Sequence, residues 1–76
     1  MEQPVLEQRL MTVWPEVVGP MAARLTTRLE IRDGVLYAYI HSAALKNELF
    51  IYRFDLVRRL NDAVGGKVIH DIRLLG

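Results

Sequence analysis

The sequence offers few side chains that could carry out catalysis. His41 and His70 are its two histidines, and neither stands in a serine–carboxylate pattern or at a metal-ligand spacing such as His-x-x-x-His. Cysteine is absent, which excludes thiolate nucleophiles, thiolate metal sites and disulfides. A histidine on the apolar face of a strand, where we expect His70, is typical of a hydrogen-bonded core residue. We therefore expect a non-enzymatic protein without metal or cofactor, which works by binding.

The run Gly65-Gly66-Lys67 is the one segment that resembles a phosphate-binding loop. A phosphate is held by the free amide groups at the start of a helix, whereas this run follows an expected helix. We interpret it as the point where that helix ends.

Tyrosines and arginines alternate along the middle of the chain, and such side chains can stack on bases and contact phosphates. The candidate nucleic-acid-binding residues are Arg28, Arg32, Tyr37, Tyr39 and Lys46. An ordinary structural role stays open, because strands favour aromatic residues and the cross-strand pairs Arg28–Tyr39 and Glu30–Tyr37 would stabilise a sheet. The net charge of +1 falls short of the strongly basic balance of most nucleic-acid-binding domains.

A second candidate set, for partner binding, combines apolar and basic residues: Phe50, Ile51, Arg53, Phe54 and Arg58. Contiguous exposed aromatic residues mark protein interfaces. Two ordinary alternatives remain. An N-terminal helix can cover Phe50 and Phe54, and Asp55 and Asp62 can both pair with Arg58 and Arg59 in a solvated, salt-bridged helix face.

A chain of 76 residues allows one domain, over residues 1–76, with a marginal core that buries roughly 60% of the unfolded surface. The chain has no apolar run long enough to span a bilayer and no signal-peptide pattern, so we expect a cytoplasmic protein without membrane contact. Surplus apolar residues and unpaired sheet edges also raise the hypothesis of a homodimer.

A helical region with two interruptions is expected before the first strand. Leu6, Leu10 and Val13 recur at helical spacing. Pro15 favours an interruption after Trp14, and Gly19-Pro20 favours an end and a restart. We predict a broken N-terminal helix.

Residues 27–41 predict a β-hairpin. Asp33-Gly34 tolerates the positive φ angles of a two-residue turn. Such a turn would pair Ile31 with Leu36, Leu29 with Ala38 and Thr27 with Ile40, and would place these six side chains on one face of the sheet.

One long helix and a last strand follow the hairpin. Ser42 can cap the helix, which is expected to end at Gly65-Gly66. Its expected buried stripe is Leu45, Leu49, Tyr52, Leu56, Leu60 and Ala63. Residues 67–75 predict a strand with Val68, His70, Ile72 and Leu74 on one face. The expected order is α-β-β-α-β, an α+β fold with a three-stranded sheet.

An ordered series of landmarks resembles the DciA family. They are Trp14-x-x-Val17-Val18-Gly19, Thr26, Asp33-Gly34-Val35-Leu36, Ser42-Ala43-Ala44-Leu45-Lys46-Asn47-Glu48-Leu49, Leu60-Asn61, Val68 and Ile72-Arg73. The likeness covers residues 14–75 and is to the short form, without a basic tail. Both a trimmed piece of a longer protein and a short gene product fit the position of Met1.

The resemblance implies a KH-like α+β domain that binds the replicative DnaB-type helicase and assists its loading on DNA at replication initiation, aided by weak contact with single-stranded or forked DNA. The helicase would contact Phe50, Arg53, Phe54 and Arg58. The sequence departs from the family pattern in two ways that weaken the expectation of DNA binding. It lacks the Gly-x-x-Gly loop with which KH domains hold nucleotides, and it lacks a basic extension. The alternatives are a KH-like nucleic-acid-binding module without a helicase partner and a self-associating structural domain.

Overall fold

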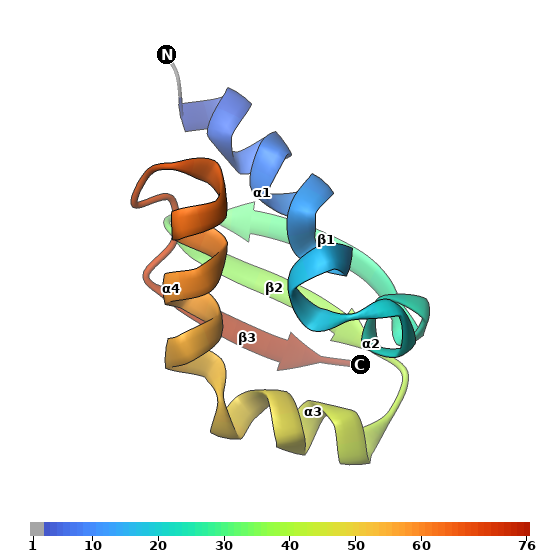
Figure 1. Ribbon diagram of the computed structural model, residues 1–76. Coiled ribbons are helices and arrows are strands. Elements are labelled where there is room, and N and C mark those ends of the chain that lie inside the picture. Colours follow the sequence, from blue (N-terminus) through green and yellow to red (C-terminus); the bar gives the residue numbers. More distant parts are fainter. Residues whose placement is uncertain (1–2) are drawn as a thin grey trace.

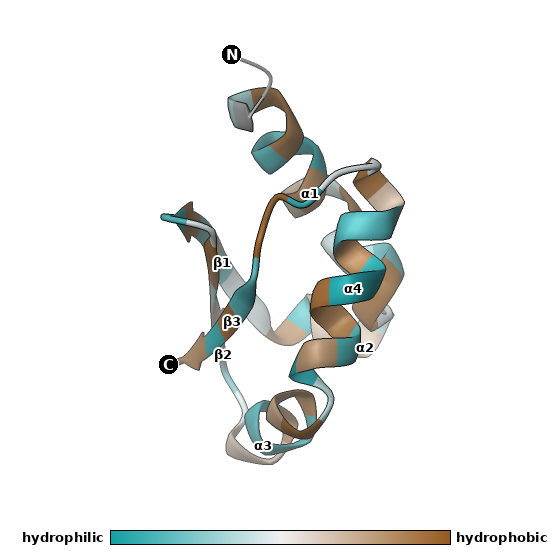
Figure 2. Cartoon of the chain, turned by 90° about the vertical axis from the view of Figure 1, so that its left-hand side faces the viewer, coloured by the Kyte–Doolittle hydropathy of each residue, from teal (hydrophilic) through white to brown (hydrophobic). Residues whose placement is uncertain are grey.

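Residues 3–76 are described by the computed structural model, in which helices and a three-stranded sheet form two layers (Figure 1). The elements are α1 (Gln3–Val18), α2 (Pro20–Leu25), β1 (Thr26–Arg32), β2 (Val35–Ile40), α3 (Ala43–Ile51), α4 (Arg53–Val64) and β3 (Asp71–Leu75). Within this range, the helices lie on one side of the sheet and leave the other side open (Figure 2). The expected α+β class and the order α-β-β-α-β are confirmed.

The N-terminal helix is broken at one place instead of two. It ends at Val18, and α2 begins at Pro20, as expected, but α1 continues through Pro15. The amide of Gly19 donates to the Pro15 carbonyl at 2.9 Å, so helical bonding resumes after the proline. Leu10 and Trp14 are buried in the core, and this packing outweighs the local preference for an interruption. The interruption expected after Trp14 is therefore wrong.

The hairpin confirms most of its expected pairing. β1 and β2 are antiparallel, with Ile31 opposite Leu36 and Leu29 opposite Ala38. Near its start, β1 contains an irregularity, and Thr26 takes the place opposite Ile40 that was expected for Thr27. The Thr26 hydroxyl accepts a hydrogen bond from Nε1 of Trp14 at 3.1 Å and donates one to the Ala22 carbonyl at 2.8 Å. These two bonds draw Thr26 to the helical side, which explains the shift.

Gly34 in the hairpin turn gives a first stability prediction. Its φ is +76°, and a Cβ atom there would lie 2.6 Å from Cδ2 of His70. We expect Gly34→Ala to lower the free energy of unfolding by about 1–2 kcal/mol for the left-handed backbone, with a further loss from the clash. Gly65→Ala is the matched control, since its φ is +77° and nothing lies within 4 Å of its Cβ position. Urea unfolding in a His70→Ala background should remove the difference between the two; equal losses in the original background would contradict the clash.

The expected long helix is two helices, because the chain breaks at Tyr52. Ser42 caps α3 as expected, its Oγ accepting from the Leu45 amide at 3.2 Å, and Gly65 ends α4 with φ +77°. The break changes the phase of the buried stripe. Leu49, Leu56 and Leu60 are buried, whereas the expected core residues Tyr52 and Ala63 are exposed and Val64 is buried in their place.

The last strand is shorter than expected and pairs in parallel with β2, so the sheet order is β1-β2-β3. Val68 and Ile69 precede β3 and are both buried, so the strand alternation expected over residues 67–70 is wrong. The side chain of Asn61 binds this segment through three hydrogen bonds. His70 is exposed instead of buried, with Nε2 at 3.2 Å from the Asp33 carbonyl oxygen.

Candidate partner and nucleic-acid interfaces

Four consecutive or nearly consecutive apolar side chains are exposed where α3 meets α4. The exposed fractions are 51% for Phe50, 68% for Ile51, 57% for Tyr52 and 66% for Phe54. We call these four residues the junction patch. The break at Tyr52 creates the patch, because it ends one helix and starts the next within this run of large side chains.

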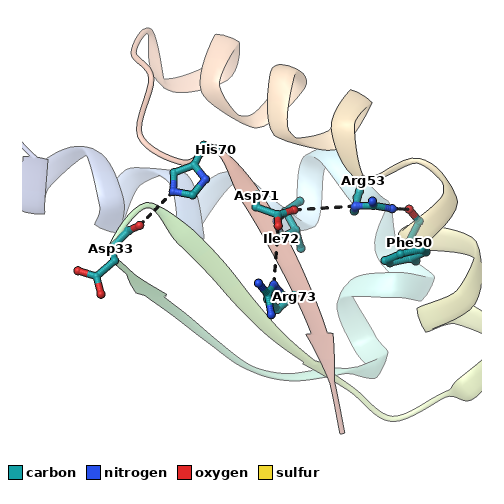
Figure 3. A network of polar contacts seen from close by, with 7 residues as sticks. All are labelled: Asp33, Phe50, Arg53, His70, Asp71, Ile72 and Arg73. Atoms are coloured by element: carbon teal, nitrogen blue, oxygen red, sulfur yellow. Dashed lines mark hydrogen bonds and ion pairs between the residues drawn. The ribbon is translucent and has the colours of Figure 1, made fainter.

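Arg53 lies between the residues of the junction patch in sequence and contacts two of the patch's aromatic rings. The guanidinium carbon lies 3.9 Å from the ring centroid of Phe50 and 4.5 Å from that of Phe54, both distances typical of cation–π contacts. Figure 3 shows Nη1 of Arg53 donating to the Phe50 carbonyl, at 3.1 Å, and Nε facing Asp71 Oδ1, at 3.9 Å. The other carboxylate oxygen of Asp71 faces Nε of Arg73 at 3.7 Å. Arg53 is thus held in one place by an aromatic pair and a carboxylate.

The N-terminal helix does not cover the junction patch. α1 packs against α4 through a core that includes Leu10, Trp14, Leu56 and Leu60, and it leaves Phe50 and Phe54 exposed. The alternative in which that helix buries Phe50 and Phe54 is therefore wrong. Val57, in contrast, packs partly against the core.

Arg58 lies farther along α4, where its charge is shared with an acidic neighbour. Its guanidinium forms a hydrogen-bonded ion pair with Asp55, and Nη1 of Arg59 lies 4.0 Å from the same carboxylate. Within residues 3–76 no ion pair involves Asp62, so the second expected pairing is wrong. The two ion pairs of Asp55 form the solvated, salt-bridged helix face that the helical spacing of these residues predicted.

The open side of the sheet, which we call the outer face, gathers charged and aromatic side chains from all three strands. The strand registers place them in three rows, Arg32–Val35–Asp71, Glu30–Tyr37–Arg73 and Arg28–Tyr39–Leu75. Arg28, Arg32, Tyr37 and Tyr39 are thus brought together as predicted. His41 is exposed just beyond the end of β2.

Each tyrosine of the outer face has an arginine over its ring. The guanidinium carbon of Arg32 lies 4.6 Å from the Tyr37 centroid, and that of Arg28 lies 5.5 Å from the Tyr39 centroid. Both arginines also face Glu30, at 3.7 Å for Arg28 and 3.5 Å for Arg32. The expected cross-strand pairs Arg28–Tyr39 and Glu30–Tyr37 are present in the register. The face therefore holds its own stabilising pairs as well as exposed cations.

Lys46 lies apart from the other candidate nucleic-acid residues, on α3, where it borders an open groove between α3 and β3. Sequence reasoning also missed residues of these surfaces. Asp71, Arg73 and Leu75 join the outer face only because β3 pairs with β2, and Tyr52 is exposed only because the helix breaks there. Neither event leaves a local signal in the sequence.

The described part of the chain contains no group of three histidine, aspartate or glutamate side chains that could hold a metal ion. None of the helices in residues 3–76 has both the length and the apolar character needed to cross a bilayer. The candidate interfaces are therefore surfaces for binding other molecules, namely the junction patch, the outer face and the groove.

Comparison with known proteins identifies the family. The family model described as Dna[CI] antecedent, DciA, matches residues 1–74. No curated protein and no solved structure matches the chain. The DciA family is associated in general with the loading of the DnaB-type replicative helicase. Because the match covers nearly the whole chain, this protein belongs to the DciA family.

Proposed function

We propose that the protein is a non-enzymatic accessory factor that binds the DnaB-type replicative helicase and assists its loading on DNA at replication initiation. The observation that supports this proposal is the junction patch, a contiguous set of exposed large apolar residues on a domain whose family is associated with helicase loading. Soluble domains seldom expose such sets unless a partner covers them.

The junction patch, together with the adjacent Arg53, has the composition of a binding hot spot. Interface energy concentrates in a few aromatic and arginine side chains that become fully desolvated. Phe50, Phe54 and Arg53 supply these types, and the two ring contacts hold Arg53 in place before a partner arrives. A side chain that is already ordered loses little conformational entropy on binding.

Arg58 is proposed to lie at the rim of the same interface. Its pairing with Asp55 leaves it 67% exposed, so its charge can contact an acidic group of the helicase without being buried. Rim charges of this kind act on association rate and partner choice more than on affinity.

The outer face is proposed to contact single-stranded or forked DNA, as the secondary part of the same function. Support comes from its openness and from three arginines beside two tyrosine rings. Glu30 and Asp71 offset much of this charge, so we propose a weak, salt-sensitive contact. A KH-like fold remains a prediction from the resemblance to the DciA family.

Phe54→Asp tests the helicase interface. We expect it to reduce capture of the purified cognate helicase about tenfold or more, because a carboxylate would be desolvated where a ring had packed. The measurement is a titrated pull-down or biolayer interferometry with the intact helicase, with circular dichroism as the check that the variant is folded.

Met21→Asp is the matched control, since Met21 is 75% exposed on α2 and the substitution makes the same change of chemistry. Tyr37→Ala should likewise preserve helicase capture while weakening oligothymidylate binding at low salt. Equal capture by the Phe54→Asp variant and the unmodified protein would remove the junction patch from the mechanism.

A further inference from the structure

A groove runs between α3 and β3, with a volume of about 630 Å³. Most of its lining is apolar and comes from Ala43, Ala44 and Phe50 on α3 and from Ile72, Leu74 and Leu75 on β3. Alanines on the helical side leave room for a polypeptide backbone to approach the strand. The groove shares only Phe50 with the junction patch.

The β3 side of the groove is a sheet edge with free backbone groups. Among the described residues, β3 pairs with β2 alone. The amide of Ile72 donates to Oδ1 of Asp71 at 2.8 Å, which indicates that this amide points away from β2. Alternation along a strand then places the Leu74 amide and carbonyl on the same free edge. Such an edge can pair with another extended segment.

The charges that line the groove are of one sign. Lys46 and Arg73 are the charged residues that line the groove, and both are cationic. Asp71, on the same strand, already faces Arg53 and Arg73. Arg73 and Leu75 belong to the outer face, and Arg73 is 63% exposed, whereas the rest of the apolar lining lies on the side of α3. A strand added at this edge would thus meet mainly apolar groups on one face, and the cation Arg73 beside Leu75 on the other.

We propose that this groove binds an extended peptide whose apolar and acidic residues alternate, and that the peptide adds to β3 as a fourth strand. Its backbone would bond to Leu74, its apolar side chains would pack against Ala43 and Ala44, and its carboxylates would face Arg73. Strand addition of this type takes affinity from main-chain hydrogen bonds and specificity from alternate side chains. This binding is separate from the proposed helicase contact.

The same observations disfavour a nucleic acid in this groove. A polyanion binds through many cations, but only two line the groove, and the whole chain carries a net charge of +1.

The test uses a fluorescein-labelled peptide of about nine residues with alternating valine and glutamate, and a valine–lysine peptide of the same length. Anisotropy titration should show the valine–glutamate peptide binding about tenfold or more tightly, a difference that Arg73→Glu should reverse. In amide hydrogen exchange, the Leu74 amide should become protected when the valine–glutamate peptide binds.

Ala44→Gln should abolish this binding by filling the groove, whereas Ala63→Gln, at an exposed alanine of α4, should preserve it. Phe54→Asp should also preserve it, which separates this result from failure of the helicase proposal. Absent binding, an unchanged Leu74 amide, or displacement of the peptide by a 15-nucleotide oligothymidylate would overturn the proposal. Concentration-dependent protection of Leu74 without peptide would overturn it as well, in favour of a second copy of the chain.

Discussion

Replacing Trp14 with alanine is expected to lower the free energy of unfolding by about 3–5 kcal/mol, the usual loss when a large aromatic side chain is removed from a core. Trp14 is 1% exposed and lies in the core cluster with Leu10 and Leu60. Its Nε1 group also donates to Thr26 at the start of β1. Since a domain of this size has a total stability of about 4–11 kcal/mol, the substitution should remove from about a quarter to all of it.

Urea unfolding followed by circular dichroism measures this loss, because Trp14 is the single tryptophan and its fluorescence disappears with the substitution. Trp14→Phe should lose less, since most of the buried surface remains and Thr26 keeps its bond to the Ala22 carbonyl. Tyr52→Ala is the matched control, an aromatic residue that is 57% exposed. If Trp14→Ala cost no more than Tyr52→Ala, the core position of α1 would be wrong.

Local chemistry determines the parts of the fold that could be predicted. The Asp33-Gly34 turn has φ angles of +53° and +76°, which fix a two-residue hairpin and with it the pairing of Ile31 with Leu36. Ser42 and Gly65 mark a helix start and a helix end for equally local reasons. These features depend on residues that are neighbours in sequence.

The features that could not be predicted depend on distant contacts. α1 passes through Pro15 because Trp14 is buried against other elements. The break at Tyr52 involves neither proline nor glycine, and Arg53 at the break reaches Asp71, 18 positions along the chain. No periodicity within residues 43–64 indicates such a contact.

The candidate surfaces also combine features set by neighbouring residues with features set by distant contacts. Sequence reasoning placed Arg28, Tyr37 and Tyr39 on one face, because the hairpin alone aligns them. The third strand contributes Arg73 and Asp71 through a parallel pairing that the hairpin does not determine. The groove beside α3 depends on that pairing as well, so it could not be predicted before the fold was known.

Asn61 provides the second large stability prediction, because it fixes the segment that leads into β3. Its Nδ2 group donates to the Ile69 carbonyl at 2.8 Å, and its Oδ1 atom accepts from the amides of Val68 and Ile69 at 3.0 and 3.1 Å. Ile69 is 4% exposed, so Asn61→Ala would leave a buried amide and a buried carbonyl without these bonds. We expect a loss of about 2–6 kcal/mol in the free energy of unfolding, the sum of two penalties of about 1–3 kcal/mol each for buried polar groups left without a partner.

Asn47→Ala is the matched control for the same urea titration. Asn47 is exposed on α3, and no side-chain hydrogen bond involves it in the part of the chain that the structure describes, so its loss should stay within about 0.5 kcal/mol. Amide hydrogen exchange should also show faster exchange at Ile69 in the Asn61→Ala variant. A stability loss equal to that of Asn47→Ala would mean that β3 is held in place by its pairing with β2 alone.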